Sequence, residues 1–355
     1  MTSPLVTIGI LSFKDKKYLE KGLPSLLEQN YPNFEILICD NNEDPQEEIR
    51  KWINQTFPTI KVLNAGGNIG FGRGHNYLIS QSHPDSQYYL CFNSDMYAAP
   101  DFISKLVETI EKDKKIGAVT GKLLKWSSFP SIPSYSSSDS SLVASAKRVA
   151  LSGAQEKIDT TGLLAHASHY FAERGHGELD QGQYDTIGEI WGASGAAVMF
   201  RMEALQDIKQ SENEFFDKNF FMYKEDIDLS YRLRWAGWKI FYTPQAISWH
   251  DRTAQDPGGI IENIKKRKDR APYIKENSFL NHLQLLYKNW SPDYSLKTKF
   301  KTSIFLLKYF LYLAIFDRKV LAKYQTFRQL KPSIIATKSS MPRRITAKEM
   351  EKWFI

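Results

Sequence analysis

The sequence predicts an α/β fold in which a mixed, mostly parallel sheet is flanked by helices and followed by a C-terminal helical extension. A β-branched run at 5–11, apolar residues at helical spacing in 18–27 and an apolar run at 34–39 give strand, helix and strand in succession. This order suits a right-handed parallel βαβ unit. Two later strand-like runs, 60–63 and 88–92, extend the pattern.

The composition is that of a soluble globular protein with a substantial core, since 42% of the 355 residues are hydrophobic and 25% are charged. The two cysteines, Cys39 and Cys91, fall inside apolar strand-like runs. This placement predicts no disulfide framework and favours a reducing compartment. The apolar run 7–10 is too short for the core of a signal peptide, so we expect a cytoplasmic protein.

The net charge of +7 is divided unevenly along the chain. Residues 1–259 contain 26 Lys and Arg against 33 Asp and Glu, whereas residues 260–355 contain 21 against 7. We therefore predict two parts, a mildly acidic body at 1–259 and a basic extension at 260–355. A basic extension favours an anionic partner surface, either a membrane or a nucleic acid.

Polar residues follow two of the predicted strands. Asp40 comes directly after the run 34–39, and Asn93-Ser94-Asp95 follows the aromatic-rich run 88–92. Ligands of open α/β sheets bind beyond the carboxyl ends of the strands, so Asp40 is a candidate acceptor for a nucleobase or ribose hydroxyl. Turn formation or helix capping is the simpler alternative for these residues.

A glycine-rich loop precedes the next helix. Five of the nine residues at 66–74 are glycine, which permits positive φ angles and a close approach of backbone to a ligand. The helix expected at 74–80 presents an N-terminus that favours anions, and Arg73 adds a cation suited to phosphate. The glycine spacing matches neither a P-loop nor the dinucleotide fingerprint, and a plain flexible loop is the alternative.

The middle of the chain contains less regular segments. Residues 125–145 are rich in Ser and Pro and predict a variable loop, and Arg174 and Glu178 lie in a charged loop with several glycines. The small residues Gly192-Ala193-Ser194-Gly195 would let a backbone pass close to a bound sugar. Tight packing of a buried strand against a helix explains them equally well.

A second group of carboxylates begins a helix predicted over 225–236. Glu225 and Asp226 lie in its first turn, where the helix dipole favours an ionised carboxylate, a useful property for a general base. The alternative is that these two carboxylates only offset the positive end of the helix dipole. Asp228 and Arg232 are one helical turn apart, and we expect them to form a surface ion pair.

His250 closes the second of two strand-like runs, 238–242 and 246–251, that end the body. From a strand end it could reach the same sheet edge as Asp95. Imidazole and carboxylate together make a suitable mixed site for an ion such as Mn²⁺. A histidine with a structural role is the alternative.

The extension contains an apolar run at 304–316 that is interrupted by Lys308. It is shorter than the roughly 20 residues that a membrane-spanning helix needs, and we expect it to lie in the interface of an anionic membrane. Packing against the body is the alternative. Because no nucleic-acid-binding module is present, we expect no nucleic acid partner, and we expect residues 333–345 to be poorly ordered. The flanking basic residues are Lys297, Lys299, Lys301, Arg318 and Lys319, and a separate basic cluster contains Lys265, Lys266, Arg267, Lys268 and Arg270.

Taken together, these motifs resemble the family-2 glycosyltransferases with the GT-A fold, over roughly residues 5–255. The arrangement is most similar to the rhamnosyltransferase-like branch that builds bacterial surface polysaccharides. The resemblance implies a Rossmann-like catalytic domain at 1–259, with 125–190 as a variable insertion on the acceptor side. The motifs are Gln29-Asn30-Tyr31-Pro32, Asp40, the 66–76 loop, Asn93-Ser94-Asp95, Gly192–Ala197, Phe216-Asp217, Phe220–Arg232 and Trp249-His250.

The resemblance implies inverting transfer of a sugar from a UDP- or dTDP-sugar, including dTDP-rhamnose, to a hydroxyl of a glycan or polyprenyl-linked glycan. Asp226, beside Glu225, would be the general base, and Asp95 and His250 would hold Mn²⁺ or Mg²⁺. Membrane attachment would place the enzyme on the inner face of the cytoplasmic membrane. The implied donor residues are Ser12, Phe13, Asp40, Asn68, Arg73, Asn76, Asn93, Ser94 and Asp95. The implied acceptor-side residues are Gly192, Ala193, Ser194, Gly195, Arg174 and Glu178.

Asn93 departs from the family pattern, because it is neutral where a carboxylate often stands. Metal affinity would then rest on Asp95 and His250.

Two other functions compete with this interpretation. A nucleotidyltransferase also binds nucleotide over an α/β sheet, although no basic glycine signature for a triphosphate occurs near the N-terminus. The third candidate is a carbohydrate-binding protein with a decayed site, for which Asn93 is the main argument.

Overall fold

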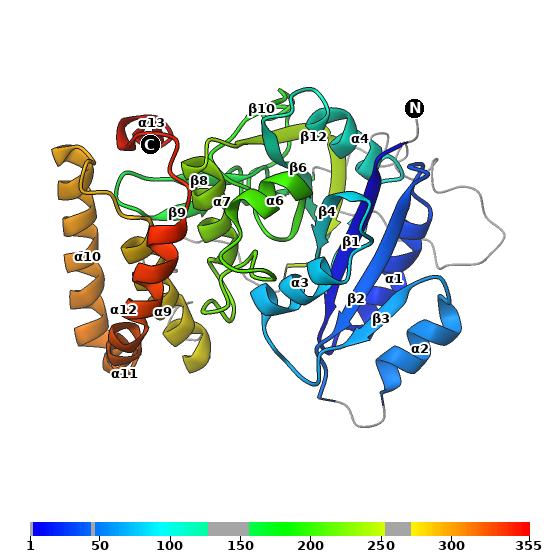
Figure 1. Ribbon diagram of the computed structural model, residues 1–355, viewed down its shortest axis with the longest axis horizontal. Coiled ribbons are helices and arrows are strands. Elements are labelled where there is room, and N and C mark those ends of the chain that lie inside the picture. The colour runs from blue at the N-terminus through cyan, green and yellow to red at the C-terminus, as the bar shows by residue number, and fades with distance from the viewer. Residues whose placement is uncertain (1–2, 44–46, 127–155, 253–270) are drawn as a thin grey trace.

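The computed structural model describes residues 3–43, 47–126, 156–252 and 271–355. They form a ten-stranded sheet with helices on both faces and a group of C-terminal helices beside it (Figure 1). The predicted α/β class is confirmed. Most of the Ser- and Pro-rich stretch and the basic cluster at 265–270 lie outside the described residues.

The body consists of strands and helices in alternation. Its first half contains β1 (Leu5–Ser12), α1 (Lys16–Leu27), β2 (Phe34–Asp40), α2 (Glu48–Thr56), β3 (Lys61–Asn64), α3 (Phe71–Ser80), β4 (Ser86–Phe92), β5 (Met96–Ala98), α4 (Phe102–Ile110) and β6 (Ile116–Lys125). Its second half contains β7 (Ile158–Thr160), β8 (Leu163–Ala165), β9 (Phe171–Glu173), β10 (Gly188–Glu189), β11 (Ala197–Arg201), α6 (Met202–Ile208), α7 (Glu225–Trp235) and β12 (Lys239–His250). The expected βαβ unit is β1, α1 and β2, because β1 and β2 pair in parallel.

Most of the long strands run in one direction. β1 pairs in parallel with β2 and β4, β2 with β3, and β12 with β6. β11 lies antiparallel between β4 and β6, so the two parallel groups that it joins share a direction. Residues that follow β1, β2, β4 and β12 therefore meet residues that precede β11 at one edge of the sheet. Ligands of α/β sheets bind at such an edge.

Alternate residues of each strand contact different helical layers. On β2, Ile36 and Ile38 belong to the core shared with α1 and α4, whereas Leu37 and Cys39 belong to the core shared with α3, α6 and α7. Burial on both faces explains why the strands read as continuous apolar runs. Cys39 and Cys91 are buried free thiols, as expected.

β12 is a single strand, although its sequence reads as two runs. Its register with β6 shifts after Thr243, and the bulge contains Pro244, which cannot donate a ladder hydrogen bond. A Cβ on Gly121 of β6 would overlap the carbonyl oxygen of Ala246, so glycine is needed where the bulged backbone approaches. Beyond the bulge the strand continues to His250 at the sheet edge.

The C-terminal extension packs against the body. It contains α9 (Pro272–Asn289), α10 (Leu296–Phe316), α11 (Arg318–Leu321), α12 (Lys323–Ser340) and α13 (Ala347–Glu351). Met341 and Met350 share a buried core with Trp191 and Tyr231 of the body. The expectation of little order at 333–345 is wrong, because α12 extends through most of this stretch and Met341 is buried. No helix in the described ranges is both long enough and apolar enough to cross a bilayer.

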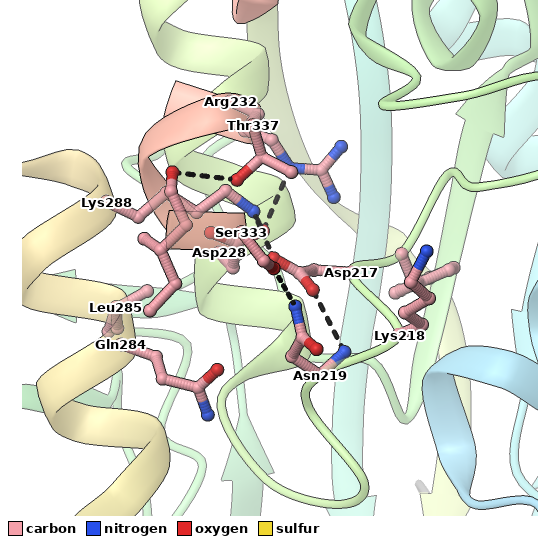
Figure 2. Close-up of polar contacts among 12 residues, drawn as sticks. Asp217, Lys218, Asn219, Asp228, Arg232, Gln284, Leu285, Lys288, Ser333 and Thr337 are labelled. Carbon is pink, nitrogen blue, oxygen red and sulfur yellow. Dashed lines mark hydrogen bonds and ion pairs between the residues drawn. The ribbon is translucent and has the colours of Figure 1, made fainter. Parts of the chain in front are cut away.

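A buried group of charges joins α9 to α7 (Figure 2). Lys288 of α9 donates hydrogen bonds to Asp217 at 2.7 Å and to Asp228 at 2.8 Å. Arg232 donates to Asp228 at 2.9 Å and also to the carbonyl oxygens of Ile208 and Phe215. Four segments of the chain are thus tied together through charged hydrogen bonds.

The expected surface pair of Asp228 and Arg232 is wrong. Both side chains are fully buried, as is that of Lys288, because α9 covers the face of α7 on which they lie. Burial raises the pKa of Asp217, but the charge and hydrogen bond of Lys288 outweigh this effect and lower it overall. The cation of the extension therefore favours the ionised form of the buried Asp217 carboxyl group.

We expect Lys288→Met to lower the free energy of unfolding by about 3 to 5 kcal/mol, because Asp217 and Asp228 would remain buried without their shared cation. Urea denaturation of the full chain measures this change. Lys105→Met is the matched control, since Lys105 pairs with Glu108 at the surface, where loss of a pair costs at most about 1 kcal/mol. Equal losses in the two variants would contradict the role assigned to Lys288.

Candidate active site

The ends of β1 and β2 form one wall of the candidate site. Ser12 and Asp40 lie opposite each other in the parallel register. Oδ1 of Asp40 accepts hydrogen bonds from the backbone N–H of Asn42 at 3.0 Å and from its side-chain amide at 2.7 Å. Phe13, in the neighbouring loop, is 43% exposed. Because both bonds use Oδ1, capping of the loop by Asp40 is compatible with a ligand contact through its second oxygen.

Asp15 connects this wall to the end of β4. Its buried carboxylate accepts hydrogen bonds from the hydroxyl of Ser12, at 2.8 Å, and from that of Ser94. Burial raises the pKa of Asp15, and the two hydroxyl groups partly offset the rise. Ser94 therefore holds the loop after β4 against the loop after β1. The backbone N–H of Asn93 donates to the carbonyl oxygen of Ala196 at 2.8 Å.

The glycine-rich loop packs closely against the segment before α7. Gly70 has a positive φ of 83°, and a Cβ there would overlap the carbonyl oxygen of Phe221. That carbonyl accepts a hydrogen bond from the backbone N–H of Phe71 at 3.0 Å. Asn68 stabilises the turn by accepting from the Gly70 N–H at 3.0 Å. As a result α3 begins at Phe71, earlier than expected.

Asn76 and Arg73 of α3 both contact residues 215–218. Asn76 is buried; its amide donates to the carbonyl oxygen of Phe216 at 2.7 Å, and its oxygen accepts from the N–H groups of Phe215 and Phe216. Arg73 is exposed, and its Nε donates to the carbonyl oxygen of Lys218 at 3.1 Å. Asn76 can thus influence a ligand through the segment it holds, whereas Arg73 presents a cation at the surface.

Asp95 and His250 are brought together by the pairing of β12 with the short strand β5. His250 lies opposite Met96 in this register, and the N–H of Asp251 donates to the carbonyl oxygen of Asp95 at 2.9 Å. Nε2 of His250 lies 3.2 Å from Oδ1 of Asp95, while Nδ1 lies 2.8 Å from Oδ2 of Asp159. Burial alone lowers the pKa of His250, but the hydrogen bonds with Asp159 and Asp95 raise it to about 9.

This pair has the chemistry of a partial cation site. Imidazole and carboxylate both bind Mn²⁺, and nucleotide-associated Mg²⁺ is held by one or two carboxylates together with substrate phosphates. Across the described parts of the chain, no three His, Cys, Asp or Glu side chains form a group that could hold a metal. Asp95 and His250 therefore fit a cation whose other ligands are a diphosphate and water.

Three further charged residues lie beside His250, and the sequence did not predict them. Asp159 is fully buried; its Oδ1 lies 3.4 Å from Nε of Arg252. Arg252 also donates to Glu173 at 2.9 Å, and Glu173 accepts from the hydroxyl of Ser194 at 3.3 Å. The position of Arg252 two residues after His250 is a signal that could have identified it. Nothing in its sequence context marks Asp159.

The small residues before β11 approach the start of α7. A Cβ on Gly192 would lie 2.8 Å from the hydroxyl oxygen of Ser230, to which the N–H of Ala193 donates at 3.3 Å. The N–H of Gly195 donates to Oδ2 of Asp226 at 3.0 Å. Close packing therefore explains Gly192, and the same approach aims a backbone donor at the Asp226 carboxylate.

The pKa values of both carboxyl groups at the start of α7 are raised. Burial, together with the neighbouring Asp226, raises the pKa of Glu225 to about 8. Burial also raises the pKa of Asp226, and hydrogen bonds from the N–H groups of Gly195 and Ile227 partly offset this rise. Burial thus outweighs the helix dipole that we expected to keep both groups ionised. At neutral pH Glu225 is largely protonated, which leaves Asp226 as the better base.

Arg174 and Glu178 belong to a cluster around Tyr184. The guanidinium of Arg174 lies over the rings of Tyr184 and Tyr242, 4.8 Å and 5.1 Å from their centroids. Glu178 accepts from the hydroxyl of Tyr184 at 3.2 Å. These contacts shape the loop that follows Glu173.

Comparisons with known proteins agree with this geometry. A family model described as "Glycosyltransferase like family 2" matches residues 4–270. N-acetylglucosaminyl-diphospho-decaprenol L-rhamnosyltransferase of Mycobacterium tuberculosis is 25% identical over 272 residues, which cover 72% of this chain and 80% of that protein. Poly-beta-1,6-N-acetyl-D-glucosamine synthase of Staphylococcus epidermidis is 24% identical over 245 residues, which cover 69% of this chain and 49% of that protein.

The fold is also similar to that of a solved glycosyltransferase. A crystal structure of GalNAc-T7 with UDP, GalNAc and Mn²⁺ matches with a TM-score of 0.50 and 12% identity. The match covers 90% of this chain but only 58% of the length of that one. At this identity the likeness supports the predicted GT-A fold alone.

Proposed function

The chain belongs to glycosyltransferase-like family 2, and we propose that it transfers a sugar, with inversion, from a nucleotide-diphospho-sugar to a hydroxyl of a glycan or lipid-linked glycan. One observation carries this proposal. Asp95 follows β4 and contacts His250, while Asp226 is hydrogen-bonded to Gly195, just before the neighbouring strand β11. The two residues proposed to bind a cation and the proposed base thus lie at the same edge of the sheet.

The donor side is assigned to the ends of β1, β2 and β4. Ser12, Phe13 and Asp40 form a wall suited to a nucleoside, because Asp40 can accept from a base or ribose hydroxyl. Arg73 supplies a cation for the phosphates. The proposed donor is a UDP- or dTDP-sugar, including dTDP-rhamnose, and the proposed acceptor is a polyprenyl-linked glycan in the synthesis of surface polysaccharide. The name of the mycobacterial relative, a rhamnosyltransferase acting on a decaprenol-linked sugar, supports the rhamnose and the lipid-linked acceptor.

The proposed reaction is a direct displacement. Asp226 accepts the proton of the acceptor hydroxyl, whose oxygen forms a bond to the anomeric carbon as the bond from that carbon to the diphosphate breaks. The nucleoside diphosphate leaves with the electron pair. A Mn²⁺ or Mg²⁺ ion held by Asp95 and His250 would offset the charge that develops on this leaving group. Because Glu225 stays protonated, no second negative charge lies beside Asp226.

The acceptor side is assigned to the segment before β11. Gly195 fixes the orientation of Asp226 through its N–H, and Ser194 contacts Glu173 of β9. The loop that contains Arg174 and Glu178 follows Glu173, which contacts Ser194 of this segment.

The extension supplies a surface for membrane attachment. Along α10, exposed apolar side chains recur at spacings of three or four residues and form one stripe; their exposed fractions are 37–82%. Figure 1 shows α10 on the outer side of the C-terminal helices, away from the sheet. The opposite face of α10 buries Thr298, Thr302 and Leu313. The stripe consists of Leu296, Phe300, Ile304, Leu307, Leu311 and Ile315.

Lysines border this stripe. Lys297, Lys301 and Lys308 are exposed, and α10 contains neither Asp nor Glu. Pairing of the stripe with a second copy would bring like charges together, whereas an anionic membrane offers an apolar interior beneath a negative surface. We therefore infer that α10 lies in the interface of an anionic membrane, beside a lipid-linked acceptor.

Incubation of the full chain with UDP-, GDP- and dTDP-sugars, a lipid extract and Mn²⁺ or Mg²⁺ should release nucleoside diphosphate from one donor. Asp95→Ala should weaken metal-dependent donor binding on the order of tenfold or more, because the cation loses a charged ligand. Pyrophosphate as the product would instead identify a nucleotidyltransferase. No turnover and no nucleotide binding with any donor would favour a decayed carbohydrate-binding protein.

Asp226→Asn should retain donor binding and lose transfer by about 10²- to 10⁴-fold, since the amide cannot accept the proton. Glu225→Gln should keep transfer within about tenfold at pH 7, because the amide resembles the protonated carboxyl. Turnover at saturating donor, with donor affinity measured separately, checks both. The acid limb of the kcat/KM profile should lie above the range of an ordinary aspartate, because burial raises the pKa of Asp226. Equal turnover by Asp226→Asn and the parent would remove the base assignment.

Glutamine at four positions of the stripe should reduce binding to phosphatidylglycerol vesicles on the order of tenfold or more, because the apolar contact is lost. The four positions are Leu296, Phe300, Leu307 and Leu311. Sedimentation with vesicles measures binding, which should also weaken as salt is added. The matched control is Tyr324→Gln with Ile335→Gln, which removes exposed apolar side chains from α12. No binding by the parent at low salt, or equal binding by the stripe variant, would exclude this surface.

A further inference from the structure

We propose that Asp159 is the positioning residue of His250: its carboxylate holds Nδ1 of the imidazole and so aims Nε2 at Asp95. This inference rests on the proposed function, which assigns His250 to the cation. The two contacts lie on opposite sides of the ring, at 2.8 Å from Nδ1 to Asp159 and 3.2 Å from Nε2 to Asp95.

The sheet determines where Asp159 lies. β12 pairs with β6, so that Trp249 lies opposite Leu124, and β6 pairs with β7, so that Leu124 lies opposite Ile158. Asp159 is thus placed one strand beyond β6, at the end of the sheet where β12 finishes. The register of β6 and β7 shifts between Leu123 and Leu124. Asp159 falls at this irregularity, where its carboxylate reaches the ring of His250.

The second oxygen of the Asp159 carboxylate faces two basic side chains, although no hydrogen bond to it forms within the described residues. This oxygen, Oδ1, lies 3.4 Å from Nε of Arg252 and 3.5 Å from Nδ1 of His176. His176 also lies 2.7 Å from the backbone oxygen of Asp159. The side chain is fully buried, so this carboxylate has little freedom to turn away from His250.

The chemical consequence concerns the nitrogen that a cation would use. A cation binds imidazole only after the ring loses one proton. The nitrogen that donates to a carboxylate keeps its proton, so the other nitrogen loses its proton and presents its lone pair in a fixed direction. Asp159 thereby selects Nε2, the nitrogen that faces Asp95. Second partners of this kind typically change metal affinity by 10- to 100-fold. A carboxylate that merely balanced charge would have no effect on the choice of nitrogen.

Titration of the full chain with Mn²⁺, first without and then with UDP, tests the first consequence, and electron paramagnetic resonance measures the binding. Asp159→Asn should bind Mn²⁺ about 10- to 100-fold more weakly than the parent. Glu156→Gln is the matched control, because Glu156 accepts from Nε1 of Trp249, the residue before His250, at 3.1 Å. It should bind Mn²⁺ as the parent does. Equal affinity in Asp159→Asn and the parent would overturn the proposal.

A second measurement needs no metal. In the metal-free chain labelled with ¹⁵N-histidine, the Nδ1 proton of His250 should give a slowly exchanging downfield resonance, assigned by its loss in His250→Gln. Asp159→Asn should shift this resonance upfield and speed its exchange, whereas Glu156→Gln should preserve it. An unchanged resonance in Asp159→Asn would overturn the positioning role. Absence of Mn²⁺ binding by the parent, both without and with UDP, would overturn the proposed cation, and the proton resonance then decides the positioning role by itself.

Discussion

The shared direction of the long strands is the constraint on which the candidate site depends. β1, β2, β4 and β12 end at one edge of the sheet. β11 runs in the opposite direction and begins at that edge, so the residues just before β11 lie there too. With β11 reversed, Gly195 would lie at the opposite end of the sheet and could not donate to Asp226. The site is therefore a product of topology first and of side-chain chemistry second.

The sequence predicts those parts of the structure that depend on local periodicity. Burial on both faces makes β2 and β4 read as apolar runs, and the polar residues at their ends, Asp40 and Asp95, follow directly. The same kind of pattern predicts the correct edge for His250. The sequence of the single strand β12 indicates two strands, because a bulge interrupts the pattern at Pro244.

Other parts depend on pairings between segments that are far apart in the sequence, and no local sequence pattern indicates such pairings. Asp159 meets His250 only because β7, β6 and β12 are neighbours. Asp228 and Arg232 read as a surface pair, since nothing in their own helix shows that α9 will cover them. The basic residues of the extension likewise occupy two kinds of position that composition does not distinguish. Lys288 points inward and pairs with carboxylates of the body, whereas the lysines of α10 face outward.

The inward position of Lys288 limits how freely this enzyme can be recombined with its relatives. A chimera that kept the body and took another protein's C-terminal helices would retain Asp217, whose hydrogen-bonded cation comes from outside the body, and Asp228, which would keep only Arg232. Grafted helices without a basic residue in register with position 288 would present an apolar surface to those charges. The boundary between body and extension, clear in composition, is therefore a poor place to cut.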